Sequence, residues 1–229
     1  MHTGAQARLS RQVAVSQFGE PRGVRGWLAA QLVARLTGDA NRWMVDCLEV
    51  GRDDRVLDVG CGPGLAVAYA AALTGGPVIG VDASDTMVRL ALRRNRVAVR
   101  LGRVEILRAD AAGLPFPDGD FSKAGSLNSL QFWPEPEQGI RELYRVLEPG
   151  GRVAVALMAR SDDAPGPEPP PWLERTMSQV RATGFGDVVV VSRTFGGVLH
   201  RALIGSRSEK KSGAPLDPTA DGVRRGADS

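Results

Sequence analysis

The sequence contains little cysteine and histidine, and it has no long apolar run. Cys47 and Cys61 are the only cysteines among 229 residues, too few for a disulfide framework or a cysteine-based zinc site. No apolar stretch approaches the ~20 residues that a membrane-spanning helix needs, and no apolar segment typical of a secretory signal stands near the amino-terminal end. We therefore expect a cytoplasmic protein that does not bind membranes.

Lysine and concentrated charge are also scarce. Lysine occurs only at Lys123, Lys210 and Lys211, and the net charge of +3 comes from arginines scattered along the chain. Aromatic residues make up only 5% of the chain and do not alternate with basic ones. Nucleic-acid binding is therefore not expected. No cluster of carboxylates and histidines stands out, so no metal ion is expected either.

The most informative stretch is residues 55–64, which read Arg-Val-Leu-Asp-Val-Gly-Cys-Gly-Pro-Gly. Its apolar half predicts a short buried strand, and its alternating glycines predict a tight turn into an apolar helix over residues 65–73. Glycine adopts backbone angles that other residues avoid and leaves room for a ligand beside the main chain. A strand, a glycine turn and a helix start together favour a site for a nucleotide-like ligand.

Predicted strands and helices alternate from residue 55 to about residue 205. Continuous apolar strands separated by helices are typical of a mainly parallel sheet that is covered on both faces. The last two strands are too close in sequence for a helical crossover, so we expect them to pair antiparallel. The predicted strands are residues 56–59, 77–81, 104–107, 121–127, 153–157, 188–191 and 198–204, with helices starting near residues 65, 84, 139 and 172.

Composition divides the chain into three parts. Residues 1–50 carry helical patterns and are expected to form an N-terminal helical lid or extension, with packing on the flank of the sheet as an equal alternative to a lid. Residues 51–205 form the α/β domain. Residues 206–229 are polar, charged and without periodicity, and we expect them to form a disordered tail.

Three segments at successive strand ends resemble, as a set, the class I S-adenosylmethionine-dependent methyltransferases. The glycine turn has the spacing Gly-x-Gly-x-Gly two residues after an acid, which is similar to the family's motif I. The dinucleotide-binding fingerprint would instead need glycine at Leu65. Asp82 ends the second strand, Asp110 ends the third, and residues 147–151 are similar to the family's turn before strand five. Residues 112–118 resemble the small-molecule, methyltransferase type 11-like branch.

The resemblance implies the fold class and the reaction. The fold is an α/β, Rossmann-like, doubly wound and mainly parallel seven-stranded sheet, with an antiparallel edge strand, helices on both faces and an N-terminal helical extension. The methyl donor is S-adenosyl-L-methionine, which becomes S-adenosyl-L-homocysteine. The acceptor is a small organic molecule that is methylated at oxygen, nitrogen or carbon.

The resemblance also implies roles for single residues. Asp82 accepts hydrogen bonds from the two ribose hydroxyls, and Asp110 accepts one from the adenine amine. Asp58 attracts the cofactor's ammonium group or, as an equal alternative, only braces the loop. A helix N-cap is the alternative for Asp82, and a turn carboxylate for Asp110. The implied cofactor-binding residues are Asp58, Gly60, Cys61, Gly62, Gly64, Asp82, Ala83, Met87, Asp110, Ala111 and Leu127.

Residues after the fourth strand lie next to the transferable methyl group in this family. The sequence there lacks the Asn-Pro-Pro-aromatic element of enzymes that methylate amino groups of nucleobases or glutamine, which argues against such acceptors. No general base is assigned, because the two histidines are expected to be structural or exposed. The residues expected to contact the acceptor are Trp27, Trp43, Asn128, Phe132 and Trp133, with core packing an equal alternative for the last two.

Two other function classes stay open. One is a degenerate S-adenosylmethionine-binding module that acts through partners and would bind the cofactor without transferring its methyl group. The other is a nucleotide-cofactor oxidoreductase, against which Leu65 argues. The sequence does not distinguish a monomer from a homodimer.

Overall fold

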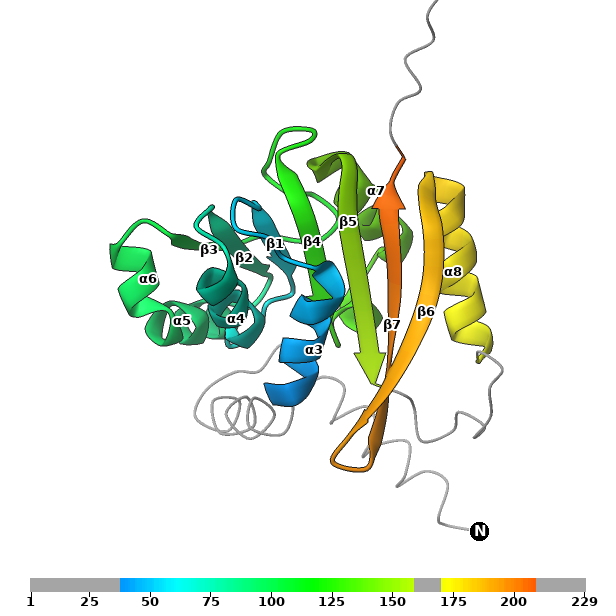
Figure 1. The fold of residues 1–229 in the computed structure, drawn as a ribbon, viewed down its shortest axis with the longest axis horizontal. Helices are drawn as coiled ribbons and strands as arrows, with labels where there is room; N and C mark the ends of the chain where they lie inside the picture. Colours follow the sequence, from blue (N-terminus) through cyan, green and yellow to red (C-terminus); the bar gives the residue numbers. More distant parts are fainter. Residues whose placement is uncertain (1–37, 159–169, 209–229) are drawn as a thin grey trace, which may run out of the picture.

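The structure, a computed structural model, describes residues 38–158 and 170–208. These residues form a seven-stranded sheet in the order β3-β2-β1-β4-β5-β7-β6 (Figure 1). The first five of these strands pair in parallel, as predicted from the alternation of strands and helices. The strands are β1 (Val56–Val59), β2 (Val78–Asp82), β3 (Val104–Arg108), β4 (Phe121–Leu127), β5 (Leu147–Met158), β6 (Phe185–Phe195) and β7 (Val198–Arg207).

Helices cover both faces of the sheet, so the predicted Rossmann-like fold class is confirmed. One apolar core lies between the sheet and α3, α4 and α5, and the other between the sheet and α7 and α8. In Figure 1, α3 crosses in front of the sheet and α7 lies behind it. The bounds are α3 (Gly38–Leu48), α4 (Leu65–Leu73), α5 (Asp85–Arg94), α6 (Arg96–Arg100), the 3-10 turn η1 (Leu130–Phe132), α7 (Pro136–Val146) and α8 (Pro171–Thr183).

The edge strand β6 pairs antiparallel with its neighbour, as predicted, but the strand that runs opposite to all the others is β7, which lies one position inside the edge. β7 runs antiparallel to β5 on one side and to β6 on the other, so β6 forms the edge. The burial of the two strands agrees with this order. Ala202, Leu203 and Ile204 of β7 are buried, whereas Val189 of β6 is 51% exposed. β7 is therefore buried on both faces, as an inner strand of a covered sheet is.

The ends of several elements differ from the prediction. The helix over residues 65–73 and the strands over 56–59 and 121–127 have the predicted bounds, while β6 is seven residues longer than expected and α6 was not predicted. β7 continues to Arg207, two residues past the predicted domain boundary. The predicted tail beyond residue 208 lies outside the described residues.

Residues 38–50 of the predicted N-terminal extension lie within the described residues, and α3 is the one helix among them. It packs against α4 and across β4, β5 and β7. The close approach to β4 depends on Gly125, where a Cβ would come within 2.6 Å of the Met44 Sδ. The described part of the extension therefore covers a face of the sheet. In the described ranges, no helix is long and apolar enough to cross a membrane.

Candidate functional site

The glycine turn joins β1 to α4 at the carboxyl edge of the sheet, the lower edge in Figure 1. Gly60, Gly62 and Gly64 all have positive φ angles, of 72°, 52° and 76°. The turn is tied to the neighbouring strand, because the N–H groups of Gly60 and Cys61 both donate to the Val81 carbonyl. Cys61 is buried, and burial raises the pKa of its thiol well above the usual value. Cys61 is therefore an unreactive packing residue of the turn.

The three glycines are needed for different reasons. A Cβ on Gly60 would lie 1.8 Å from the Ser129 Oγ, and one on Gly64 would lie 2.6 Å from the Asn95 Nδ2, so both positions are closed by the protein itself. A Cβ on Gly62 would meet no atom of the described residues within 4 Å. Gly62 is thus the glycine beside which the turn is open to a ligand.

Asp82, at the end of β2, holds two backbone segments. Its Oδ2 accepts a hydrogen bond from the Gly62 N–H and its Oδ1 accepts one from the Ser84 N–H, both at 2.9 Å. Ser84, the residue before α5, makes no side-chain capping bond. Asp82 accepts from the N–H of Ser84 itself and not from a first-turn N–H of α5, so it does not cap this helix. Burial raises the pKa of Asp82, and the two backbone donors act against that shift. Each carboxylate oxygen keeps a second lone pair for another donor.

Asp58 is the buried acid of the site. Its side chain is only 4% exposed, and no protein group among the described residues donates a hydrogen bond to it. Burial, together with the negative charge of nearby Asp82, raises the pKa of Asp58 to about 7. A buried carboxylate without a donor is costly, so this position favours a cationic or hydrogen-bonding ligand.

The end of β3 completes a row of three strand ends. The exposed Asp110 accepts a hydrogen bond from the Ala112 N–H at 2.9 Å, and Ala111 is buried beside it. The Ala109 N–H donates to the Asp82 carbonyl, which ties this segment to β2. Met87 is buried in α5, and the exposed Ala83 follows Asp82. The structure therefore brings the predicted cofactor residues of three strands to one edge of the sheet.

One brace of this edge was not predicted from the sequence. The Arg145 guanidinium, on α7, donates to the carbonyls of Leu114 and Phe116 and pairs with Glu142 and Asp118. Glu142 accepts a hydrogen bond from the Leu114 N–H at 2.8 Å. These contacts hold the segment that directly follows Asp110 and Ala111. The one available signal was the spacing of three between Glu142 and Arg145, which is common on exposed helices.

The residues after β4 have structural contacts. The Asn128 Oδ1 accepts a hydrogen bond from the Met158 N–H at 2.7 Å, which joins the ends of β4 and β5. Trp133 is buried against Gly139, and its Nε1–H donates to the Ser129 Oγ at 2.8 Å. Phe132 is half-buried in η1. Contacts of Asn128, Phe132 and Trp133 with an acceptor stay predictions.

Two further predicted acceptor residues lie in the N-terminal part of the chain. Trp27 lies outside the described residues. Trp43, on α3, is buried against Phe195 near the turn between β6 and β7, with ring centroids 5.8 Å apart. Leu127, the last residue of β4, packs against the same apolar core as Trp43.

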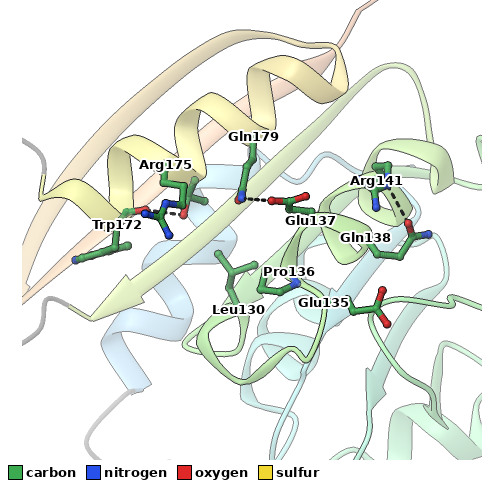
Figure 2. A pocket seen from close by; sticks show the side chains of 10 residues that line it. Leu130, Glu135, Pro136, Glu137, Gln138, Arg141, Trp172, Arg175 and Gln179 are labelled. Carbon is green, nitrogen blue, oxygen red and sulfur yellow. Dashed lines mark hydrogen bonds between the residues drawn. The ribbon is translucent and has the colours of Figure 1, made fainter.

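A separate hollow of about 480 Å³ lies between the first turns of α7 and α8 (Figure 2). Charged side chains of both signs line it, among them Glu135, Arg141 and Arg175. A hydrogen bond of 2.9 Å between Gln179 and Glu137 joins the two helices across it. None of the predicted cofactor residues lines this hollow.

Comparison with known proteins identifies the kind of domain. Residues 57–155 match a family model described as "Methyltransferase domain". An "Uncharacterized methyltransferase YdaC" from Bacillus subtilis is 28% identical over 162 residues, which are 70% of this chain and 87% of that protein. A "Ubiquinone/menaquinone biosynthesis C-methyltransferase UbiE" from Citrobacter koseri is 37% identical over 116 residues, which are 50% of this chain.

The comparisons differ in how much of each protein they cover. The chain spans only 46% of the length of the UbiE protein. Among solved structures, the "[4+2]-Cyclase SpnF" has a TM-score of 0.63 at 22% identity, over 75% of this chain and 82% of that one. At this identity the likeness concerns the fold, and a cyclase is an example of the other activities that one fold can carry.

Proposed function

We propose that this chain, a member of the class I S-adenosylmethionine-dependent methyltransferases, transfers the methyl group to a small organic molecule. The enzyme class and the cofactor follow from the family. The small size of the acceptor is supported by the segment over residues 112–118 and by the relatives' names, which include a quinone-biosynthesis C-methyltransferase. The carboxylates of Asp58, Asp82 and Asp110 and the glycine turn with its open side at Gly62 lie at the carboxyl edge of the sheet. Their common position supports the assignment of the cofactor residues.

The cofactor assignment depends on one observation above all. Gly62 lies between two acids, Asp58 and Asp82, and the space beside it is open. Packing explains Gly60 and Gly64, but no atom of residues 38–158 or 170–208 lies where a Gly62 side chain would go. The methionine part of S-adenosylmethionine would lie against this turn, with its ammonium group near Asp58. The ribose hydroxyls would donate to the free lone pairs of Asp82, and Asp110 with the Ala111 backbone would take the adenine.

The reaction needs little acid–base help from the protein. The sulfonium of the bound cofactor supplies an activated methyl group, so the chain's own residues mainly align the acceptor and exclude water. The strand ends that hold the cofactor and the residues after β4 lie at one edge of the sheet, which places donor and acceptor side by side.

Cofactor choice is tested by thermal shift with S-adenosylhomocysteine and NADH. We expect S-adenosylhomocysteine to raise the melting temperature and NADH to leave it unchanged, because the turn carries Leu65 in place of the third dinucleotide glycine. Methyl transfer from S-adenosylmethionine to fractions of a small-molecule extract is then followed by mass spectrometry. Binding without transfer to any fraction would instead support the degenerate binding module.

The Arg145 brace gives a second prediction. Replacing Arg145 with Met should weaken S-adenosylhomocysteine binding by about tenfold, because the segment after Ala111 loses the guanidinium that fixes its carbonyls. The exposed Arg141, on the same helix, is the matched control, and its change to Met should alter affinity less than ~twofold. Calorimetry at a temperature where both variants stay folded measures the difference. Equal affinities of the two variants would contradict the brace.

A further inference from the structure

Three rings from three separate elements meet at the carboxyl edge, beyond the strands that hold the cofactor site. Phe195, at the end of β6, lies 5.8 Å from the ring of Trp43 and 5.5 Å from the ring of His200, between centroids. Trp43 is 8% exposed and His200 is 3% exposed. We call these three residues the aromatic corner.

His200 has a hydrogen-bonding atom that no other described residue uses. Its Nδ1 lies 3.2 Å from the Val198 carbonyl, so Nδ1 carries the proton and Nε2 has a free lone pair. Nε2 is buried and has no hydrogen-bond partner among the described residues. Burial also lowers the pKa of His200, which keeps the imidazole neutral near pH 7. A buried, unpaired acceptor lowers stability, so this position favours a hydrogen-bond donor beyond the described residues, such as a bound ligand.

The strand register places the aromatic corner on the acceptor side of the cofactor site. His200 pairs with Met158 of β5, and the Met158 N–H donates to Asn128 at the end of β4. Two strand spacings of ~4.8 Å therefore separate His200 from the end of β4, or about 10 Å. Leu127, at that end of β4, packs against the same core as Trp43 and Phe195. Figure 1 shows the turn between β6 and β7 at this edge of the sheet.

We propose that the aromatic corner binds a largely apolar, hydroxyl-bearing acceptor, with the rings of Trp43 and Phe195 against its body and the His200 Nε2 accepting a hydrogen bond from its hydroxyl. This inference rests on the proposed methyltransferase function and names the acceptor class for it. A neutral imidazole with a free lone pair accepts a hydrogen bond from a hydroxyl, whereas a molecule without an N–H or O–H group has no proton to donate, so the His200 Nε2 favours phenols and other alcohols over their ethers. The Arg193 guanidinium lies 5.4 Å from the Phe195 ring centroid, and Arg193 is the cross-strand neighbour of His200.

The test compares two probes on the full chain saturated with S-adenosylhomocysteine. 1-Naphthol carries a hydroxyl, and 1-methoxynaphthalene has the same apolar body without the O–H. We expect 1-naphthol to bind about tenfold more tightly, and the preference to vanish in His200→Phe while S-adenosylhomocysteine affinity is unchanged. Trp43→Leu should weaken both probes alike.

A spectroscopic readout needs no change within the aromatic corner. The chain has only two histidines, so the His200 imidazole nitrogens can be assigned in long-range proton–nitrogen spectra by comparison with His2→Gln. Addition of 1-naphthol should shift the Nε2 resonance, and 1-methoxynaphthalene should not. No binding of 1-naphthol, an unmoved Nε2, or a preference retained in His200→Phe would overturn the proposal. Failure to bind S-adenosylhomocysteine would instead overturn the proposed function.

Discussion

Replacing Asp82 with Ala is expected to weaken S-adenosylhomocysteine binding by about 100-fold, or ~2.7 kcal/mol. The change removes the acceptor proposed for the ribose hydroxyls. It also frees the N–H groups of Gly62 and Ser84, which the carboxylate now holds at 2.9 Å. Binding of S-adenosylhomocysteine must then also order the glycine turn, which lowers the affinity further. Both losses act in the same direction, so the effect should exceed that of a single charge-assisted hydrogen bond.

Two control variants make this prediction specific. Asp82→Asn keeps one acceptor oxygen and should lose about tenfold in affinity, between the wild type and Asp82→Ala. Asp85, three residues further on, carries a side chain that is 61% exposed, and Asp85→Ala should change affinity less than ~twofold. Isothermal titration calorimetry measures all three. Wild-type affinity in Asp82→Ala would reject the ribose assignment.

Replacing Asp58 with Asn should change the free energy of unfolding by an amount that depends on pH. At high pH this change should be similar in size to the loss of binding free energy in Asp82→Ala. The Asp58 pKa of about 7 lies well above that of an unfolded chain, so the stabilising contribution of Asp58 is present below about pH 4 and is lost as the pH rises through 7. Asp58→Asn removes the buried charge. It should therefore raise the free energy of unfolding of the unliganded protein at pH 8 by on the order of 2–4 kcal/mol, and change it little at pH 4.

The same variant should bind the cofactor poorly. An ionised Asp58 attracts the ammonium group of S-adenosylhomocysteine, so binding below pH 7 requires Asp58 to release its proton. Wild-type affinity should fall by up to ~tenfold per pH unit below 7, and this pH dependence should be absent in Asp58→Asn. Calorimetry in buffers of different ionisation enthalpy detects the released proton. A stability loss in Asp58→Asn at both pH values, with unchanged affinity, would assign Asp58 to loop bracing alone.

The fold was largely predictable because its signals are local. The turn over residues 60–64 and the strand and helix beside it carry glycine spacing and apolar periodicity that tertiary contacts reinforce. The placement of β7 between β5 and β6 was missed, because it depends on how two adjacent apolar strands compete for the inner position. The longer β6 was missed because its residues Ser192 and Thr194 are exposed and polar.

The positions of the acids and glycines near the strand ends could be predicted from the sequence, but their contacts could not. Sequence spacing indicated that Asp82 ends β2, but β3 ends at Arg108, two residues before Asp110, and not at Asp110 as predicted. Spacing also did not indicate that Asp82 would hold the Gly62 N–H. Spacing also suggested one shared reason for all the glycines, whereas the structure shows Gly60 closed by Ser129, a residue 69 positions away. Contacts between residues far apart in sequence, such as Arg145 with Leu114, leave no periodic pattern to read.

The central claim is that the carboxyl ends of β1, β2 and β3 together hold the adenosyl cofactor. Amide proton–nitrogen spectra of the full chain with and without S-adenosylhomocysteine test it most directly. We predict that the perturbed amides cluster at residues 60–64, at Ala83 and at Ala111. No perturbation, or perturbation confined to the hollow between α7 and α8, would contradict it.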